Sequence, residues 1–470
     1  MKAEAFGSGS KLPQRRFALC AFAIVLLALV IRVLYVWMTT VEFPIRGDVN
    51  QYVLYAWNLT HRSVFSTALP DADSAPPDDY RGPGYPMFLA GAMILAGHSD
   101  LPLRSGPEGR SALGYVTDTW MKIALGFQIV LGTATVWFVI ALGRFWLADG
   151  WALAAGLLTA LWPHLVTFTG VLLSETLFAL LLLLALWLSC LAYEARSRIF
   201  MAAAGAVWGV AYLVNPLIAL FPLVAAALIL RGRGRRLAAT LVAAFLLAPA
   251  VWTIRNAVSV RDSGTLHRAE ENFVQGSWPE FLTAFNSQRD NDISRRIVDA
   301  VNTEAQQLKG SFAAGLVEIE ARMAQDPRYY AAWYVARKPY LLWDWSIRVG
   351  AGDIYFLPVQ HSPFEKIPVL STVRAALRWA NPLIFALAAA CSFTILGLSL
   401  LRRKGSAPAL LAGLLLLYLT SVHVVLQAEP RYSIPYRPEE ILLALTAAAW
   451  LSERLRNALR QPRSGASTHF

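Results

Sequence analysis

Residues 17–38 read FALCAFAIVLLALVIRVLYVWM, an apolar run that follows Lys11, Arg15 and Arg16. An α-helix needs about 20 apolar residues to cross the hydrocarbon core of a bilayer. The run is too long for a signal-peptide core, and no clear small-residue cleavage site follows it. We therefore interpret it as an uncleaved membrane anchor.

The rest of the chain repeats this pattern. Its 470 residues are 56% hydrophobic and only 16% charged, and several further runs are long enough to span a bilayer. We expect an all-α, polytopic membrane protein with about ten transmembrane helices. The candidate spans are about 17–38, 119–145, 150–169, 172–193, 199–214, 217–230, 237–254, 379–401, 407–426 and 434–451.

The net charge of +11 does not indicate nucleic-acid binding, because the basic residues form short clusters between apolar runs. Such clusters set the topology of membrane proteins. Cys20, Cys190 and Cys391 all fall inside apolar runs, where we expect buried, unpaired side chains. Their spacing predicts neither a disulfide nor a metal site.

The segment Tyr85–Gly97 decides the sidedness of everything after it. It is apolar but too short to span a bilayer. Without a crossing there, the short outer loops hold only Arg431 and Arg437, and the remaining basic clusters face the cytoplasm, as the positive-inside rule requires. Those cytoplasmic residues are Lys11, Arg15, Arg16, Arg144, Arg196, Arg198, Arg231, Arg233, Arg235, Arg236, Arg402, Arg403, Lys404, Arg454, Arg456 and Arg460. We therefore expect residues 85–97 to lie along the outer surface or to dip in and return.

Both termini are then cytoplasmic, and two large segments face outward. The Ala/Arg/Leu-rich composition indicates that the membrane is a bacterial inner membrane. Surface-lying helices are expected in the first outer loop, beginning at Asp48, and amphipathic helices at 293–308 and 311–324 in the second. The aromatic run 329–345 is typical of the headgroup layer. The expected divisions are a cytoplasmic tail 1–16, a membrane core 17–256 that includes the outer loop 39–118, an extracytoplasmic loop 257–378, C-terminal membrane helices 379–451 and a basic cytoplasmic tail 452–470.

Asp48 lies in the first outer loop, about ten residues after the first span, and Arg81 follows it in the turn Arg81-Gly82-Pro83-Gly84-Tyr85-Pro86. Transfer of a sugar from a polyprenyl phosphate needs a general base for the acceptor hydroxyl and cationic groups for the departing phosphate. Asp48 fits the base and Arg81 the phosphate clamp. The alternatives are a helix N-cap for Asp48 and a solvated loop arginine for Arg81.

Glu175 stands at the outer end of a helix that is otherwise apolar. An acidic side chain there is costly unless it faces a polar cavity, so a function is the first hypothesis, and a structural hydrogen bond to a neighbouring helix is the second. His164 has no partners at metal-ligand spacing, and we expect it to lie at the membrane interface.

Several further polar residues occupy the outer ends of helices. If they converge with Asp48, they form one extracytoplasmic pocket; the alternative is that the arginines extend separately toward lipid headgroups. We expect catalytic roles for Asp48 and Glu175 and no metal ligands. The predicted substrate contacts are Tyr52, Arg81, Tyr85, Arg255, Asn256, Glu429, Arg431 and Tyr432.

Taken in order, these motifs resemble the GT-C superfamily of polytopic glycosyltransferases. More narrowly, the chain is similar to the dolichyl-phosphate-mannose–protein mannosyltransferase family and its bacterial relatives, which include aminoarabinose transferases. The resemblance covers roughly 17–256 and 379–451. The matching motifs are Asp48-x-x-x-Tyr52-x-x-x-Ala56, Arg81 to Phe88, Ser174 to Phe178, Trp252-x-x-Arg255-Asn256 and Arg431-Tyr432-x-x-Pro435.

The resemblance implies that Asp48 is the catalytic base, that Glu175 orients substrate, and that Arg81, Arg255 and Arg431 contact the donor phosphate. Two departures stand out. Many members have Asp-Glu where this chain has Asp48-Val49, which leaves the need for a divalent cation open, and Gly82 replaces a proline of the turn.

The sequence thus predicts an inverting glycosyltransferase, a hexosyl or pentosyl transferase acting outside the cytoplasm. Its partners would be a polyprenyl-phosphate sugar donor, membrane lipids, and an acceptor hydroxyl on an envelope glycan, lipid or protein. The alternative is a lipid or solute transporter or flippase. Transporters tend to show internal repeats and polar groups at mid-membrane, and this chain shows neither pattern.

Overall fold

The computed structural model describes residues 12–97, 118–232, 234–260, 264–347, 353–401 and 406–460. The extreme tails and the predicted cytoplasmic residues Lys11, Arg233, Arg402, Arg403 and Lys404 lie outside this part of the chain. The helices before the large loop are α1 (Gln14–Met38), α2 (Asp48–Arg62), α3 (Gly84–Leu95), α4 (Thr119–Gly143), α5 (Asp149–Leu161), α6 (Pro163–Thr167), η1 (Phe168–Gly170), α7 (Glu175–Ala195), α8 (Arg198–Val214), η2 (Pro216–Ile218), α9 (Phe221–Gly232) and α10 (Arg235–Ser259).

The second half of the chain is also helical. Its helices are α11 (Gly264–Ser277), α12 (Phe281–Ser287), α13 (Asp292–Gly310), α14 (Phe312–Gln325), α15 (Pro327–Ala332), η3 (Trp333–Arg337), α16 (Lys338–Leu342), α17 (Pro363–Lys366), α18 (Pro368–Leu400), α19 (Ala407–Val425), η4 (Pro430–Tyr436) and α20 (Arg437–Arg460). Strands β1 (Thr40–Val41) and β2 (Val359–Gln360) form a short antiparallel pair between the two outer segments.

The all-α, polytopic fold class is confirmed. In the described residues, six helices are long and apolar enough to cross a membrane, namely α1, α4, α7, α10, α18 and α19. Helix α5 and the segment Pro163–Gly170 pass the same test only as a pair, and they are bent by 57° at Pro163, because proline cannot donate a backbone hydrogen bond inside a helix. The predicted spans 199–214, 217–230 and 434–451 correspond to the shorter apolar α8, to the apolar segment Pro216–Arg231 and to α20.

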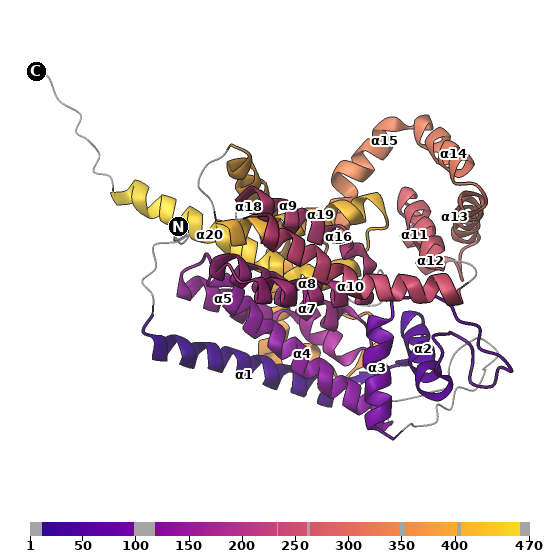
Figure 1. Ribbon diagram of the computed structural model, residues 1–470, viewed down its shortest axis with the longest axis horizontal. Coiled ribbons are helices and arrows are strands. Elements are labelled where there is room, and N and C mark those ends of the chain that lie inside the picture. The colour runs from indigo at the N-terminus through magenta and orange to yellow at the C-terminus, as the bar shows by residue number, and fades with distance from the viewer. Residues whose placement is uncertain are drawn as a thin grey trace, which may run out of the picture.

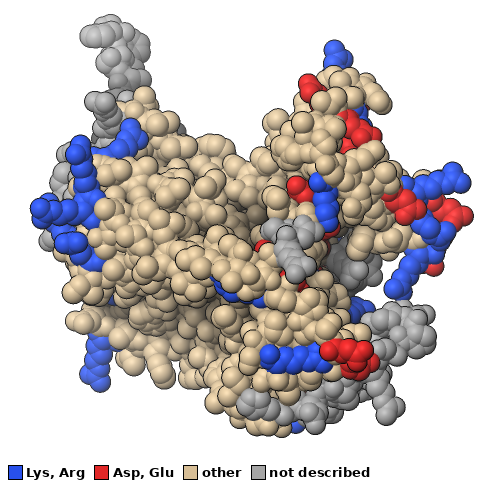
Figure 2. Space-filling view, turned by 45° about the vertical axis from the view of Figure 1, so that its right-hand side comes forward, with Lys and Arg blue, Asp and Glu red and all other residues tan. Residues whose placement is uncertain are grey.

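Figure 1 shows the long helices side by side, with the start of α1 and the end of α20 at one end of the bundle. Helices α2, α3 and α11 to α14 gather at the other end, so the two predicted outer segments share one side. Helix α3 runs across the direction of α1 and α4 (Figure 1), as a surface-lying helix does. Basic side chains also gather at the end opposite α11 to α14 (Figure 2). Arg196 and Arg198, at the junction of α7 and α8, are exposed.

Close packing of α8 on α10 shapes the wall of the bundle. A Cβ atom at Gly205 would lie 2.5 Å from the carbonyl oxygen of Leu241, and one at Gly209 would lie 2.8 Å from that of Phe245. Two small residues four apart let helix backbones approach closely in membranes. The two glycines therefore hold α8 close to α10, and the C-terminal end of α8 contacts part of the site.

The outer lobe has a small core of its own, built by the amphipathic faces of α11 to α14. Its buried members include Val274, Phe281, Val301 and Leu308. In the aromatic run that follows, Trp343 and Trp345 are buried in the main core, whereas Tyr340 is exposed. Likewise Cys20 is exposed on α1, whereas the other two cysteines are buried, and all three are unpaired.

Candidate active site

Asp48 is the first residue of α2 and does not act as its cap. The N-cap is Gly47, whose φ of 56° favours glycine, and no side chain caps this helix. The two carboxylate oxygens of Asp48 instead accept from two arginines: Oδ1 lies 2.6 Å from Arg81 Nη2, and Oδ2 lies 2.8 Å from Arg431 Nη2. The side chain of Asp48 is 28% exposed, which leaves it accessible from the adjoining cavity.

Arg431 connects Asp48 to the second predicted acid. Its Nε donates to Glu175 Oε1 over 2.6 Å, and its guanidinium lies 4.3 Å from the ring centre of Phe356. Arg431 and Glu175 are both buried. One planar guanidinium therefore binds two carboxylates that come from α2 and α7, a geometry that a point charge such as lysine does not reproduce.

The charges of this cluster act on one another. Burial opposes ionisation of Asp48, but the positive charges of Arg431 and Arg81 outweigh it and hold the pKa of Asp48 well below its usual range. Burial also opposes the charge on Arg431, yet Glu175 and Asp48 raise its pKa well above the ordinary value. Asp48 and Arg431 are thus both charged at neutral pH.

The glycines of the first outer loop seat Arg81. A Cβ atom at Gly82 would lie 2.4 Å from the carbonyl oxygen of Leu213, and one at Gly84 would lie 2.8 Å from the amide nitrogen of Val214. The turn therefore rests directly on the outer end of α8. Arg81 Nε also donates to Gln51 Oε1 over 2.7 Å, so the position of its guanidinium is fixed by both α2 and α8.

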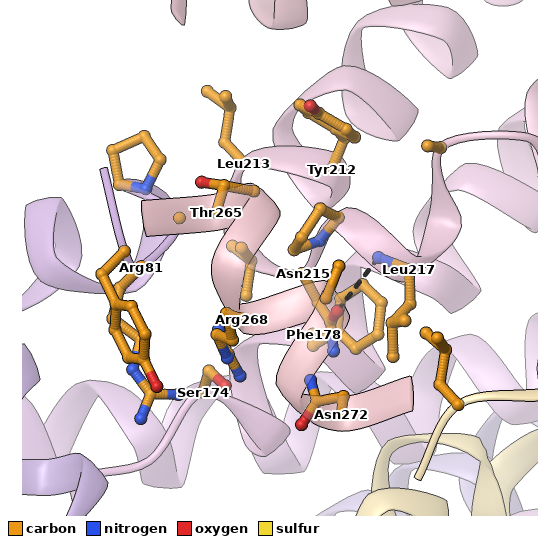
Figure 3. Close-up of a pocket in the computed structure, with 18 of the residues that line it drawn as sticks. Arg81, Ser174, Phe178, Tyr212, Leu213, Asn215, Leu217, Thr265, Arg268 and Asn272 are labelled. Atoms are coloured by element: carbon orange, nitrogen blue, oxygen red, sulfur yellow. Dashed lines mark hydrogen bonds between the residues drawn. The ribbon is translucent and has the colours of Figure 1, made fainter. Parts of the chain in front are cut away.

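The lining of a cavity of about 740 Å³ includes Asp48, Arg81, Glu175 and Arg431. Figure 3 shows part of the lining of this cavity, with Arg81 labelled. The polar part of its lining includes Asp48, Tyr52, Asp79, Tyr80, Arg81, Ser174, Glu175, Asn215, Asn256, Arg268, Asn272, His423, Gln427, Arg431 and Tyr432. The apolar part includes Tyr212, Leu213, Leu217, Leu220, Trp252, Val260, Tyr418, Val422 and Leu426. Leu220 is 61% exposed, so the apolar part reaches the surface of the bundle. The cavity suits a ligand with an anionic head and a hydrocarbon tail.

Sequence reasoning missed Arg268 and Asn272, which project from α11 into the cavity (Figure 3). In the part of the chain that the structure describes, the Arg268 guanidinium makes no hydrogen bond or ion pair, and it lies 6.0 Å from the ring centre of Tyr80. Its charge also helps to lower the pKa of Asp48. The sequence offered no sign of it, because the second outer loop carries no matching motif.

Three predicted contacts lie outside the cavity lining. Tyr85 is fully buried and its hydroxyl donates to Gln128 Oε1 over 3.0 Å. Arg255 donates to the carbonyl oxygen of Asp78 over 2.7 Å and lies over Trp252, so it ties α10 to the first outer loop. Glu429 precedes η4 without lining the cavity.

The other predicted contacts line it. The ring centre of Tyr52 lies 5.5 Å from the Arg81 guanidinium, and the ring of Tyr432 stacks on that of His423. Asn256 donates to Asp79 Oδ2. His164, which we expected at the membrane interface, is buried, and its Nε2 lies 2.8 Å from the carbonyl oxygen of Trp345.

The residues present fit a divalent cation poorly. Among the described residues, no three His, Cys, Asp or Glu side chains gather at a possible metal site. Both oxygens of Asp48 already accept from guanidinium groups, and Arg431 lies between Asp48 and Glu175. A cation placed between these carboxylates would be repelled by Arg431.

Comparison with known proteins gives a fold likeness only. No protein-family model and no curated sequence matches the chain. The crystal structure of the apo oligosaccharyltransferase of Archaeoglobus fulgidus matches with a TM-score of 0.50 at 14% identity, covering 95% of this chain and 52% of that one. The structure of ArnT from Cupriavidus metallidurans bound to undecaprenyl phosphate matches with a TM-score of 0.47 at 15% identity, covering 93% and 62%.

This chain therefore spans about half the length of the oligosaccharyltransferase and about three-fifths of that of ArnT. The likeness runs over nearly the whole of the present chain. It extends from the membrane bundle to the outer segments and agrees with the fold class that the sequence predicted.

Proposed function

We propose that this chain, whose fold is that of the GT-C glycosyltransferases, transfers a sugar from a polyprenyl-phosphate donor to an acceptor hydroxyl on the extracytoplasmic side. The observation that carries the proposal is a single cavity with two chemically different parts. Asp48 and three arginines line the polar part, and apolar side chains from η2, α10 and α19 line the part that reaches the bundle surface. A lipid-linked phosphate needs both parts at once.

The chemistry follows from this arrangement. Asp48 accepts the proton of the acceptor hydroxyl, whose oxygen forms a bond to the anomeric carbon of the donor sugar. The bond between that carbon and the phosphate oxygen breaks, and the electron pair leaves with the polyprenyl phosphate. Arg81, Arg268 and Arg431 stabilise the charge that develops on the departing phosphate. One displacement inverts the configuration at the anomeric carbon.

Without donor, each carboxylate oxygen of Asp48 accepts a hydrogen bond from an arginine, and these bonds make the carboxylate a weaker base. A bound phosphate competes for the same N–H groups, because arginine forms paired bonds with phosphate as well as with carboxylate. In our proposal the donor takes over part of the arginine contacts and releases Asp48 toward the acceptor. Donor binding would thereby prepare the base, and Glu175 would hold Arg431 during the exchange.

The experiment that tests the proposal uses the purified chain in nanodiscs with a panel of labelled polyprenyl-phosphate sugars and an envelope extract as acceptor. A transferase releases free polyprenyl phosphate and labels one acceptor, which mass spectrometry then identifies. Movement of intact donor across proteoliposomes without release of polyprenyl phosphate would instead support the transporter alternative. No release with any donor of the panel would reject the proposal.

A further inference from the structure

Arg32 lies in α1, about 9 Å along the helix from its outer end at Met38, given a rise of 1.5 Å per residue. An arginine near the end of a span usually extends to the headgroups. Here the side chain is fully buried, and only Nη1 has a partner, the carbonyl oxygen of Ala28 at 3.1 Å. Nε and Nη2 have no partner among the described residues. A guanidinium in this position needs something to bind.

Arg32 and Glu175 line the same small cavity, between α1, α4 and α7. Glu175 uses Oε1 to accept from Arg431, whereas its Oε2 is buried without a protein partner. The cavity volume is about 10 Å³, which is close to the space that one water molecule needs. Thr135 and Thr176 also line it, and each has a hydroxyl oxygen that can accept a further hydrogen bond.

Gly132 keeps this space open. A Cβ atom there would lie 2.7 Å from Arg32 Nε and 2.9 Å from Thr169 Cγ2. Any larger residue would therefore displace the guanidinium or close the cavity. Glycine at this place in α4 allows Arg32 to reach the back of Glu175.

We propose that Arg32 is a positioning residue, which binds one internal water molecule and through it holds the Glu175 carboxylate aimed at Arg431. Water donates to Glu175 Oε2 and accepts from Arg32, so both unpartnered groups are satisfied. The proposal rests on the proposed function, because Glu175 matters there only as the support of Arg431. Arg32 itself lines this rear cavity and not the large one.

The charged and titratable groups that face Glu175 are few. They are Arg32 from α1, Arg431 and Tyr436 from η4, and Tyr85 from α3. The two phenols are uncharged near neutral pH. Removal of Arg32 therefore leaves Arg431 as the sole cation of this set to orient the Glu175 carboxylate.

The test compares Arg32→Met and Arg32→Lys with wild type. We expect Arg32→Met to lower kcat by about tenfold, the scale of one hydrogen bond to a charged group, and to leave the KM for the donor nearly unchanged, because Arg32 does not line the large cavity. Thermal stability should not fall, because methionine removes a buried charge that lacks a direct partner. Arg32→Lys should restore most of the activity. Equal losses of stability and activity, without rescue by lysine, would overturn the proposal.

A second pair of variants distinguishes the effect of filling the small cavity from the effect of replacing a glycine elsewhere in α4. Gly132→Ala should behave like Arg32→Met, whereas Gly126→Ala on the same helix meets nothing within 4 Å and should match wild type. Infrared difference spectra, in which Glu175→Gln identifies the carboxylate stretching band of Glu175, test the inference without turnover: the band should shift when Arg32 is replaced, because the carboxylate loses its water-mediated hydrogen bond. An unchanged band in Arg32→Met would contradict the inference even if the transfer reaction itself were disproved.

Discussion

Arg431→Lys is the substitution whose effect on kcat/KM can be estimated most directly from the structure. Arg431 donates to Glu175 over 2.6 Å and to Asp48 over 2.8 Å from two different nitrogens. A lysine ammonium keeps the positive charge but has a single nitrogen instead of a planar guanidinium, so it can form a strong hydrogen bond with one carboxylate but only a weak one with the other. One lost hydrogen bond between charged groups corresponds to about 1.5–3 kcal/mol. We expect kcat/KM to fall by roughly 10- to 100-fold.

The assay measures release of free polyprenyl phosphate by the variant in nanodiscs, together with its thermal unfolding in detergent. Arg431→Gln should lower the free energy of unfolding further, by about 3–5 kcal/mol, because it leaves two buried carboxylates without the cation between them. Arg144→Lys is the matched control: Arg144 pairs with Asp149 over 3.3 Å but is 47% exposed, and such pairs contribute at most about 1 kcal/mol. Arg431→Lys with wild-type activity would refute the bridging role.

Three further outcomes are expected. Arg268→Ala should raise the KM for the donor by roughly tenfold at unchanged thermal stability, because Arg268 makes no ion pair within the described chain; an unchanged KM would remove it from the phosphate site. Transfer should persist in excess EDTA, since Arg431 occupies the space between the two acids, and loss of activity that Mg²⁺ or Mn²⁺ restores would show the opposite. Burial lowers the pKa of Lys338 to about 7 in the folded protein, whereas an unperturbed lysine has a pKa of about 10.4. Burying the ammonium therefore costs its full free energy below about pH 7, and this cost falls progressively between about pH 7 and 10.4. Lys338→Met should accordingly raise the melting temperature more at pH 6 than at pH 10, and a gain independent of pH would contradict this reasoning.

The sequence predicted the positions of the long apolar helices well because apolar length is a local property, although six of the ten predicted spans are single helices long and apolar enough to cross a membrane within the described residues. The sequence was less informative about side chains whose surroundings depend on tertiary contacts. Trp343 and Trp345 have the composition of an interfacial belt, yet they fill the core between helices that are distant in sequence. Arg255 and Arg431 both follow apolar runs, but Arg255 ties two backbone segments together and only Arg431 reaches the acids.

The residues of the candidate site likewise divide into those that the sequence indicated and those that only tertiary contacts reveal. Asp48, Glu175, Arg81 and Arg431 were found from motif order, and the structure brings their side chains together. Arg268 was missed because nothing in its neighbourhood marks it, and it reaches the cavity only because α11 docks against the first outer loop through Gly264 N and Asp79 Oδ1, 2.7 Å apart. Arg32 was passed over because, within an apolar run, a single arginine gives no indication of which way it faces.

The central claim is that Asp48 takes the acceptor proton, and Asp48→Asn tests it most directly. The account predicts that kcat for release of polyprenyl phosphate falls by about 10² to 10⁴, the usual contribution of a general base, while the variant still folds and binds donor. Asp149→Asn, which changes a buried acid near the start of α1, should keep nearly full activity. An Asp48→Asn enzyme that turns over at a rate close to wild type would contradict the account.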